Sequence, residues 1–200
     1  MKKNNIILIG FMGTGKSSVG TSLADALSMK FLDTDNEIEK RCQMTIKELF
    51  QNRGEEAFRS METNLLREYQ ATLSQTVIST GGGMPLCAEN ASLLREIGYV
   101  VFLKTSKEVT YQRLKYDTTR PLLQCEDPFG AIEQMLKIRV PIYEACADMV
   151  LETKDKSIVT IVQEILSSTK NLNVKAQGQE RLSVTEQEQE RLSVKTQEQR

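Results

Sequence analysis

Residues 10–17 read Gly-Phe-Met-Gly-Thr-Gly-Lys-Ser, which matches the pattern G-x-x-x-x-G-K-[ST]. The apolar run 6–9 precedes this stretch, and Val19 and Leu23 follow it at helical spacing. A buried strand, a glycine-rich loop and a helix in this order form a phosphate-binding loop (P-loop), in which backbone N–H groups and the helix N-terminus bind an anion. A purely structural glycine-rich turn is the alternative, but the Lys-Ser pair disfavours it. The sequence therefore predicts a nucleotide-binding protein.

The loop also supplies the side chains that a nucleoside triphosphate requires. Lys16 is expected to reach the β- and γ-phosphates, and the Ser17 hydroxyl is expected to ligate Mg²⁺. The residues expected to contact the nucleotide are Gly13, Thr14, Gly15, Lys16, Ser17 and Ser18. A P-loop alone does not indicate which reaction follows binding.

Short apolar runs alternate with helical patterns along the chain. The runs are 6–9, 30–32, 77–80, 99–103 and 149–151. Several are continuously apolar, which is typical of parallel strands buried on both faces. Capping signals separate them from helices, such as Thr45 with Glu48 and Asp127 before Pro128. This alternation predicts one α/β domain over residues 1–170.

The sequence changes character after about Asn171. Gln-Glu-Arg-Leu-Ser-Val occurs at 179–184 and again at 189–194, within sequence rich in glutamine and glutamate. Such polar, low-complexity sequence cannot bury enough apolar surface to fold alone. We therefore expect a disordered tail over residues 171–200, with a partner-binding segment as the alternative.

The composition excludes several classes of protein. A net charge of -1 disfavours a general nucleic-acid binder, and no apolar run approaches the length of a membrane span. The four cysteines form no C-x-x-C pair and no secretory signal precedes them, so we expect a cytoplasmic protein with reduced thiols. A monomer is expected. With no histidine in the chain, acid–base chemistry falls to carboxylates or lysines.

Two further motifs directly follow strands of the predicted sheet. Asp33-Thr34-Asp35 follows the second apolar run, and Thr80-Gly81-Gly82-Gly83 follows the third. Because ligands bind at the carboxyl edge of such sheets, both motifs are expected beside the P-loop. Asp33 would hold Mg²⁺ through water, Asp35 would accept a hydroxyl proton, and the glycines would let backbone lie against a ligand. The structural alternatives are an Asx turn capping a helix that begins near Glu37, and a flexible strand–helix turn.

Three arginines complete the candidate site. Arg59 shares a helical pattern with the apolar residues Phe58, Met61 and Leu65. Arg120 lies in a polar segment, about 115–127, that is expected to form a mobile lid. Arg139 is expected at the end of a helix, before Val140-Pro141. Guanidinium groups suit carboxylates and phosphates, although each arginine alone is typical of a surface salt bridge.

Taken together, these motifs resemble the shikimate kinase family over residues 4–168. The similarity extends from the P-loop through Asp33-Thr34-Asp35 to Gly54-Glu55, Phe58-Arg59 and Glu62. It continues through Ser79–Gly83, Arg120-Pro121-Leu122-Leu123 and Arg139 with Tyr143.

The resemblance implies a P-loop α/β fold with a five-stranded parallel sheet of order 2-3-1-4-5 and helices on both faces. It implies transfer of the ATP γ-phosphate to the 3-hydroxyl of shikimate, a step towards chorismate, with Mg²⁺ as cofactor. It places Lys16, Ser17 and Asp33 at the phosphates and Mg²⁺, and Arg120 at ATP. It assigns shikimate to Asp35, Arg59, Gly81, Gly82, Gly83 and Arg139.

Two alternatives stay open on the sequence. One is another small-molecule kinase, of the gluconate or nucleoside type. The other is a P-loop protein that binds nucleotide without catalysis, although the presence of Lys16, Asp35 and Arg120 disfavours it.

Overall fold

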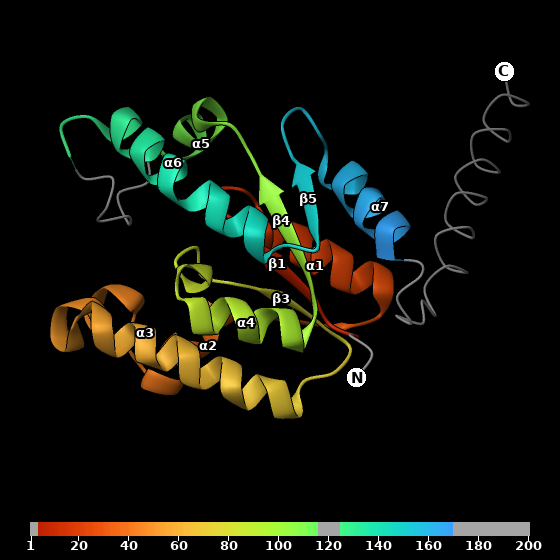
Figure 1. The fold of residues 1–200 in the computed structure, drawn as a ribbon, viewed down its shortest axis with the longest axis horizontal. Helices are drawn as coiled ribbons and strands as arrows, with labels where there is room; N and C mark the ends of the chain where they lie inside the picture. Colours follow the sequence, from red (N-terminus) through yellow and green to blue (C-terminus); the bar gives the residue numbers. More distant parts are fainter. Residues whose placement is uncertain (1–3, 116–124, 170–200) are drawn as a thin grey trace, which may run out of the picture.

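The computed structural model describes residues 4–115 and 125–169. Five parallel strands form one sheet in the order β2-β3-β1-β4-β5, and Figure 1 shows helices on both of its faces. The strands are β1 (Ile6–Ile9), β2 (Lys30–Asp33), β3 (Thr76–Ser79), β4 (Tyr99–Lys104) and β5 (Met149–Glu152). The predicted fold class and strand order are confirmed.

The helices form a layer on each face of the sheet (Figure 1). One face packs against α1 (Lys16–Leu27) and α7 (Ile158–Thr169). The other packs against α3 (Ile46–Thr72), α4 (Ala88–Ile97) and α6 (Pro128–Cys146). The remaining elements are the helices α2 (Thr34–Cys42) and α5 (Lys107–Leu114) and the 3-10 turn η1 (Met84–Leu86).

The central strand β1 is buried along its whole length. Its side chains alternate between the two layers: Ile6 and Leu8 pack with α1 and α7, whereas Ile7 and Ile9 pack with the other three helices. All four side chains are inaccessible to solvent. This is why the run is continuously apolar rather than alternating.

Helix starts follow the predicted caps in most cases. The Thr45 hydroxyl and the Glu48 carboxylate form a complete capping box at α3, and Asp127 caps α6. One start differs, because α2 begins at Thr34 rather than near Glu37. The Asp33 carboxylate accepts hydrogen bonds from the backbone of Asp35 and Asn36 and so starts the helix early.

The helix that carries Arg139 does not end there, so that prediction is wrong. α6 continues through Pro141 to Cys146. Pro141 has no backbone N–H, so the carbonyl of Lys137, four residues earlier, loses its helical partner. Both residues are exposed. Water can therefore satisfy that carbonyl, and the helix is not broken.

Residues 116–124 of the predicted lid, with Arg120, and residues 171–200 of the predicted tail lie outside the described residues. Within residues 4–115 and 125–169, no helix has both the length and the apolar character needed to cross a membrane.

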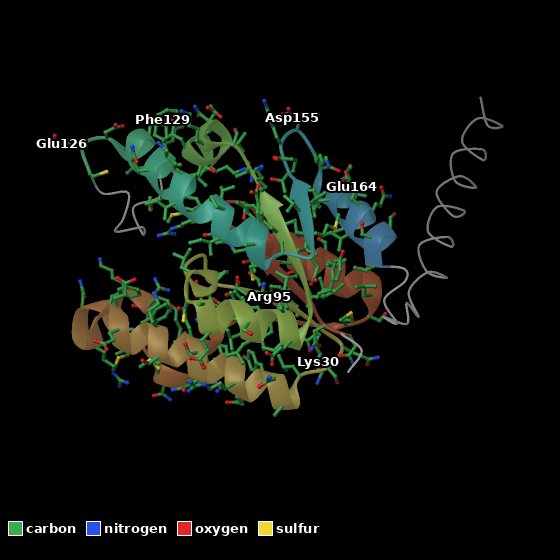
Figure 2. The ribbon with its side chains drawn as sticks, viewed as in Figure 1. Lys30, Arg95, Glu126, Phe129, Asp155 and Glu164 are labelled. Atoms are coloured by element: carbon green, nitrogen blue, oxygen red, sulfur yellow. The ribbon has the colours of Figure 1, made fainter. Side chains whose placement is uncertain are left out.

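Figure 2 shows Lys30, at the start of β2, and Asp155, just after β5, at opposite edges of the sheet. The amino-terminal ends of the central strands are held by a buried side chain, Asn5, which directly precedes β1. Its amide group donates to the carbonyls of Leu73 and Ile97 and accepts from the backbone N–H of Thr76. One side chain thus joins the ends of α3 and α4 to the start of β3.

Asn5→Ala is expected to lower the free energy of unfolding by about 2–4 kcal/mol, because two buried backbone groups and one partly buried one lose their partner. Urea denaturation measures this. The control Asn52→Ala, at an exposed position, should change stability by no more than about 0.7 kcal/mol. An equal effect at both positions would contradict the role given to Asn5.

Candidate active site

The P-loop connects β1 to α1 and lies at the carboxyl edge of the sheet. Gly15, the N-cap of α1, has φ +91°, a left-handed conformation that favours glycine. No side chain caps this helix, and its first turn carries no acidic residue. Its first N–H groups are therefore positioned for an anion.

Lys16 and Thr14 shape the loop from within. The Lys16 ammonium group donates to the carbonyls of Gly10 and Phe11, at 2.9 and 3.0 Å. The Thr14 hydroxyl is buried and donates to the Phe11 carbonyl, so it stabilises the loop's shape. Ser17 and Ser18 are exposed on the first turn of α1.

Asp33 links the P-loop to β2. The Ser17 hydroxyl donates to one oxygen of Asp33 at 2.9 Å, while the other oxygen caps α2. The functional and structural interpretations of Asp33 are therefore compatible. Two oxygen donors at this edge suit Mg²⁺, which needs few protein ligands when phosphates and water supply the others. Among the described residues no cluster of three His, Cys, Asp or Glu side chains could hold a metal ion.

The turn Gly81–Gly83 lies against the P-loop and the predicted acceptor residues. A Cβ at Gly82 would lie 3.4 Å from the Gly10 carbonyl oxygen. A Cβ at Gly81 would lie 2.5 Å from an Asp35 carboxylate oxygen, and one at Gly83 would lie 2.6 Å from an Arg59 nitrogen. Real Cβ atoms do not approach as closely as the last two distances, so Gly81 and Gly83 permit this packing, whereas Gly82 is in ordinary contact.

Arg59 reaches the turn from α3. It forms ion pairs with Glu55 at 2.9 Å and with Glu62 at 2.7 Å. Glu62 is completely buried, whereas the Arg59 side chain is 32% exposed and Glu55 is 66% exposed. The guanidinium group is therefore oriented by two carboxylates and still has an accessible face.

Arg139, on α6, is connected to the same turn through Tyr143. Its guanidinium group lies 5.4 Å from the ring centroid of Phe11 and within hydrogen-bonding reach of the Tyr143 hydroxyl. That hydroxyl donates to the Gly82 carbonyl at 2.6 Å. Burial raises the pKa of Tyr143, although Arg139 and Arg59 both act to lower it, so Tyr143 remains a donor. Both arginines therefore lie near this hydroxyl.

The buried carboxylate of Glu62 has an unusual protonation equilibrium. Burial, together with the smaller effects of the nearby carboxylates of Asp35 and Glu55, raises its pKa to about 7 against the opposing effect of Arg59. One of its oxygens, Oε1, is buried and accepts no hydrogen bond. Burial lowers the pKa of Arg59, but Glu62 and Glu55 together outweigh this effect and raise it, so this side chain stays charged.

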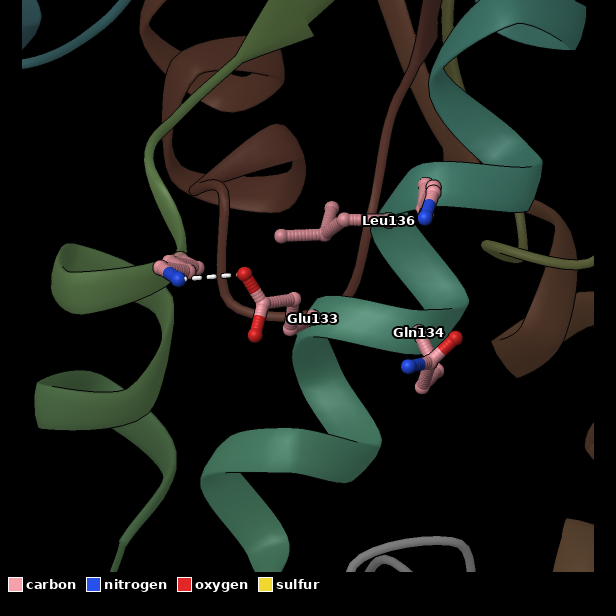
Figure 3. A pocket seen from close by; sticks show the side chains of 5 residues that line it. Glu133, Gln134 and Leu136 are labelled. Atoms are coloured by element: carbon pink, nitrogen blue, oxygen red, sulfur yellow. Dashed lines mark hydrogen bonds and ion pairs between the residues drawn. The ribbon is translucent and has the colours of Figure 1, made fainter.

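A cavity of about 510 Å³ lies elsewhere, between α5 and α6 (Figure 3). It is lined by Lys107, Glu133, Gln134, Leu136 and Lys137. Lys107 and Glu133 form an ion pair across it. Its lining includes none of the predicted site residues, and its charged, partly exposed walls are typical of solvated surface rather than of a ligand pocket.

Comparison with known proteins agrees with this geometry. A family model described as shikimate kinase matches residues 12–170. A shikimate kinase from Thioalkalivibrio sulfidiphilus is 45% identical over 81% of this chain and 85% of its own length. One from Pasteurella multocida is 43% identical over 86% of this chain and 98% of its own.

The chain belongs to the shikimate kinase family. Among solved structures, the shikimate kinase from Acinetobacter baumannii in complex with shikimate superposes with a TM-score of 0.80 at 39% identity, covering 86% of this chain and 96% of that one. The resemblance seen in the sequence is thereby confirmed. The matches also favour a shikimate kinase over the gluconate and nucleoside kinases considered above.

Several residues that hold the candidate site in place were given no role from the sequence. The buried Thr34 hydroxyl accepts a hydrogen bond from the Gly81 N–H, and Arg113 donates to the Gly13 carbonyl at 2.9 Å. Glu62 and Tyr143 were part of the resemblance but carried no assigned function. Helical spacing was the available signal, because Glu62 lies three residues after Arg59.

The raised pKa of Glu62 predicts how stability depends on pH. Between about pH 4.5 and 7 the folded protein holds a proton that the unfolded chain has lost, so rising pH destabilises the fold. The free energy of unfolding should fall by roughly 2–3 kcal/mol from pH 5 to 8 and level off above pH 7. The absence of histidine leaves few other groups that titrate there.

Urea denaturation at several pH values measures this dependence. Glu62→Gln should remove most of the fall, whereas Glu55→Gln, at the exposed partner of Arg59, should retain it. A stability that is flat or rises over this range in the unmodified protein would contradict the assignment.

Proposed function

We propose that this enzyme transfers the γ-phosphate of ATP to the 3-hydroxyl of shikimate and forms shikimate 3-phosphate on the route to chorismate. The observation that supports it best is the packing of Asp35 and Arg59 against the Gly81–Gly83 turn, which itself touches the P-loop. Arg139 lies beside the Tyr143 hydroxyl, which donates to the carbonyl of the same turn. A site for a carboxylate and hydroxyls thus lies beside a site for phosphates. The family matches support the same substrate.

The acceptor is held by complementary groups. We assign its carboxylate to Arg59 and Arg139, because guanidinium groups make charge-assisted, bidentate hydrogen bonds with carboxylates. Its hydroxyls are assigned to Asp35 and to the backbone of Gly81, Gly82 and Gly83. Asp35 then accepts the proton that the 3-hydroxyl loses as the new P–O bond forms.

The phosphates are held by charge and by backbone N–H groups. The N–H groups of Gly13 to Ser18 cradle them, and Lys16 exchanges its two carbonyl partners for phosphate oxygens when ATP binds. Phosphoryl transfer depends mainly on such positioning and electrostatic stabilisation rather than on covalent chemistry.

Two residues at the carboxyl edge of the sheet could hold Mg²⁺. The Ser17 hydroxyl would ligate it, and Asp33, which already bonds to that hydroxyl, would hold it through water. When bound, the cation neutralises charge on the β- and γ-phosphates. Arg120, in the lid, is proposed to contact ATP upon closure, which would exclude water from the reaction.

A coupled ADP-release assay tests the function. The unmodified protein is offered shikimate, quinate, gluconate and a nucleoside in turn, each with ATP and Mg²⁺. Shikimate should give the highest kcat/KM. A higher value for gluconate or the nucleoside, or no ADP release with any acceptor, would overturn the proposal.

Lys16→Ala should lower kcat by about two to three orders of magnitude, because a charged contact to the transferring phosphate is lost. The matched control is Lys30→Ala, an exposed lysine at the amino-terminal end of β2 and so away from the carboxyl ends where the P-loop lies, which should retain normal kcat. Circular dichroism verifies that both variants fold. Near-normal turnover in folded Lys16→Ala would remove this lysine from the mechanism.

A further inference from the structure

A hydrogen-bonded pair of side chains, Thr63 and Asn90, connects α3 to the segment that follows the glycine turn. The Thr63 hydroxyl donates to the Asn90 side-chain oxygen at 2.8 Å. The Asn90 amide group donates in turn to the carbonyl of Met84, at 3.2 Å. Met84 directly follows Gly83, so the two side chains bridge α3 and the turn.

Asn90 is an unusual residue to bury at this position, because its side chain is polar. It is completely buried on α4, beside the apolar residues Ala91, Leu93 and Leu94. Burying an amide group costs free energy unless its hydrogen bonds are made, and an apolar side chain would pack there without that cost. Its two bonds go to neighbouring elements, not to α4 itself, which indicates a role in joining those elements.

The two elements that it joins carry opposite sides of the acceptor site. Thr63 lies one residue after Glu62, and its hydroxyl lies 3.1 Å from the Arg59 carbonyl oxygen. It is therefore on the same turn of α3 as the charged side chains of Arg59 and Glu62. The glycine turn opposite leaves no space for even a Cβ at Gly83 beside Arg59. A small shift of α3 relative to the turn would therefore displace the guanidinium group.

We propose that Thr63 and Asn90 are positioning residues that set the separation between Arg59 and the Gly81–Gly83 turn and thereby determine the affinity for shikimate. The inference rests on the proposed function, because it assigns the acceptor carboxylate to Arg59. Neither residue contacts the acceptor, and both act through Arg59.

Thr63→Val is the decisive variant, because valine has nearly the shape of threonine and removes only the hydroxyl. Thr63→Ser restores the hydroxyl and serves as the rescue. Thr72→Val is the matched control, since Thr72 lies on the same helix, also bonds to the carbonyl four residues earlier and is exposed. Asn90→Asp is a second probe, because its carboxylate would face the Met84 carbonyl with no donor.

Calorimetric titration with shikimate in the absence of nucleotide gives one Kd, and titration with a non-hydrolysable ATP analogue gives another. Thr63→Val should raise the Kd for shikimate about tenfold, and Asn90→Asp by at least as much, with the analogue's Kd unchanged. Thr63→Ser should recover most of the loss, and Thr72→Val should show none. Thermal unfolding of each variant verifies that the protein titrated is folded.

A role in stability alone would lower the melting temperature and leave the shikimate Kd of folded Thr63→Val within twofold of the unmodified value. That result, or an equal loss for Thr72→Val, would overturn the inference while the proposed function stands. If the unmodified protein binds no shikimate, the proposed function is wrong, and the inference, which rests on it, is wrong as well.

Discussion

The position of β1 at the centre of the sheet determines where the P-loop and the Gly81–Gly83 turn lie. Its four side chains are wholly buried between two helical layers, and it pairs with β3 on one side and β4 on the other. The P-loop at its carboxyl end is therefore next to the turn that ends β3. Gly82 packs on the Gly10 carbonyl, so the P-loop and the proposed acceptor site adjoin because two neighbouring parallel strands end together.

The proposed acceptor site contains buried polar groups that would destabilise an ordinary apolar core. Glu62 is a buried carboxylate whose pKa is raised to about 7, and Asn90 is a buried amide. Both orient other groups: Glu62 orders Arg59, and Asn90 ties α3 to the glycine turn. Stability is thus given up where a charged side chain must be held in one place, as is common at functional sites.

The sequence predicted the strands, the P-loop and most helix starts because these depend on local patterns: continuous apolar runs, glycine spacing and capping residues. It did not predict the burial of Glu62 or the hydrogen bonds of Asn90 and Thr34, because these arise only when distant segments pack. In sequence, Glu62 is one more acidic residue of a polar helix. The break expected after Arg139 was wrong because solvent exposure lets α6 pass through Pro141.

Arg59 and Arg139, from two different helices, are proposed to bind one carboxylate beside the P-loop. The most direct measurement compares the Kd values of shikimate and its methyl ester for the unmodified protein, Arg59→Lys and Arg139→Lys, with Arg67→Lys on the surface of α3 as control. Esterification, or either arginine-to-lysine substitution, should weaken binding at least about tenfold, because the charge or the planar fork is lost. Equal binding of acid and ester, or normal shikimate binding by both lysine variants, would contradict it.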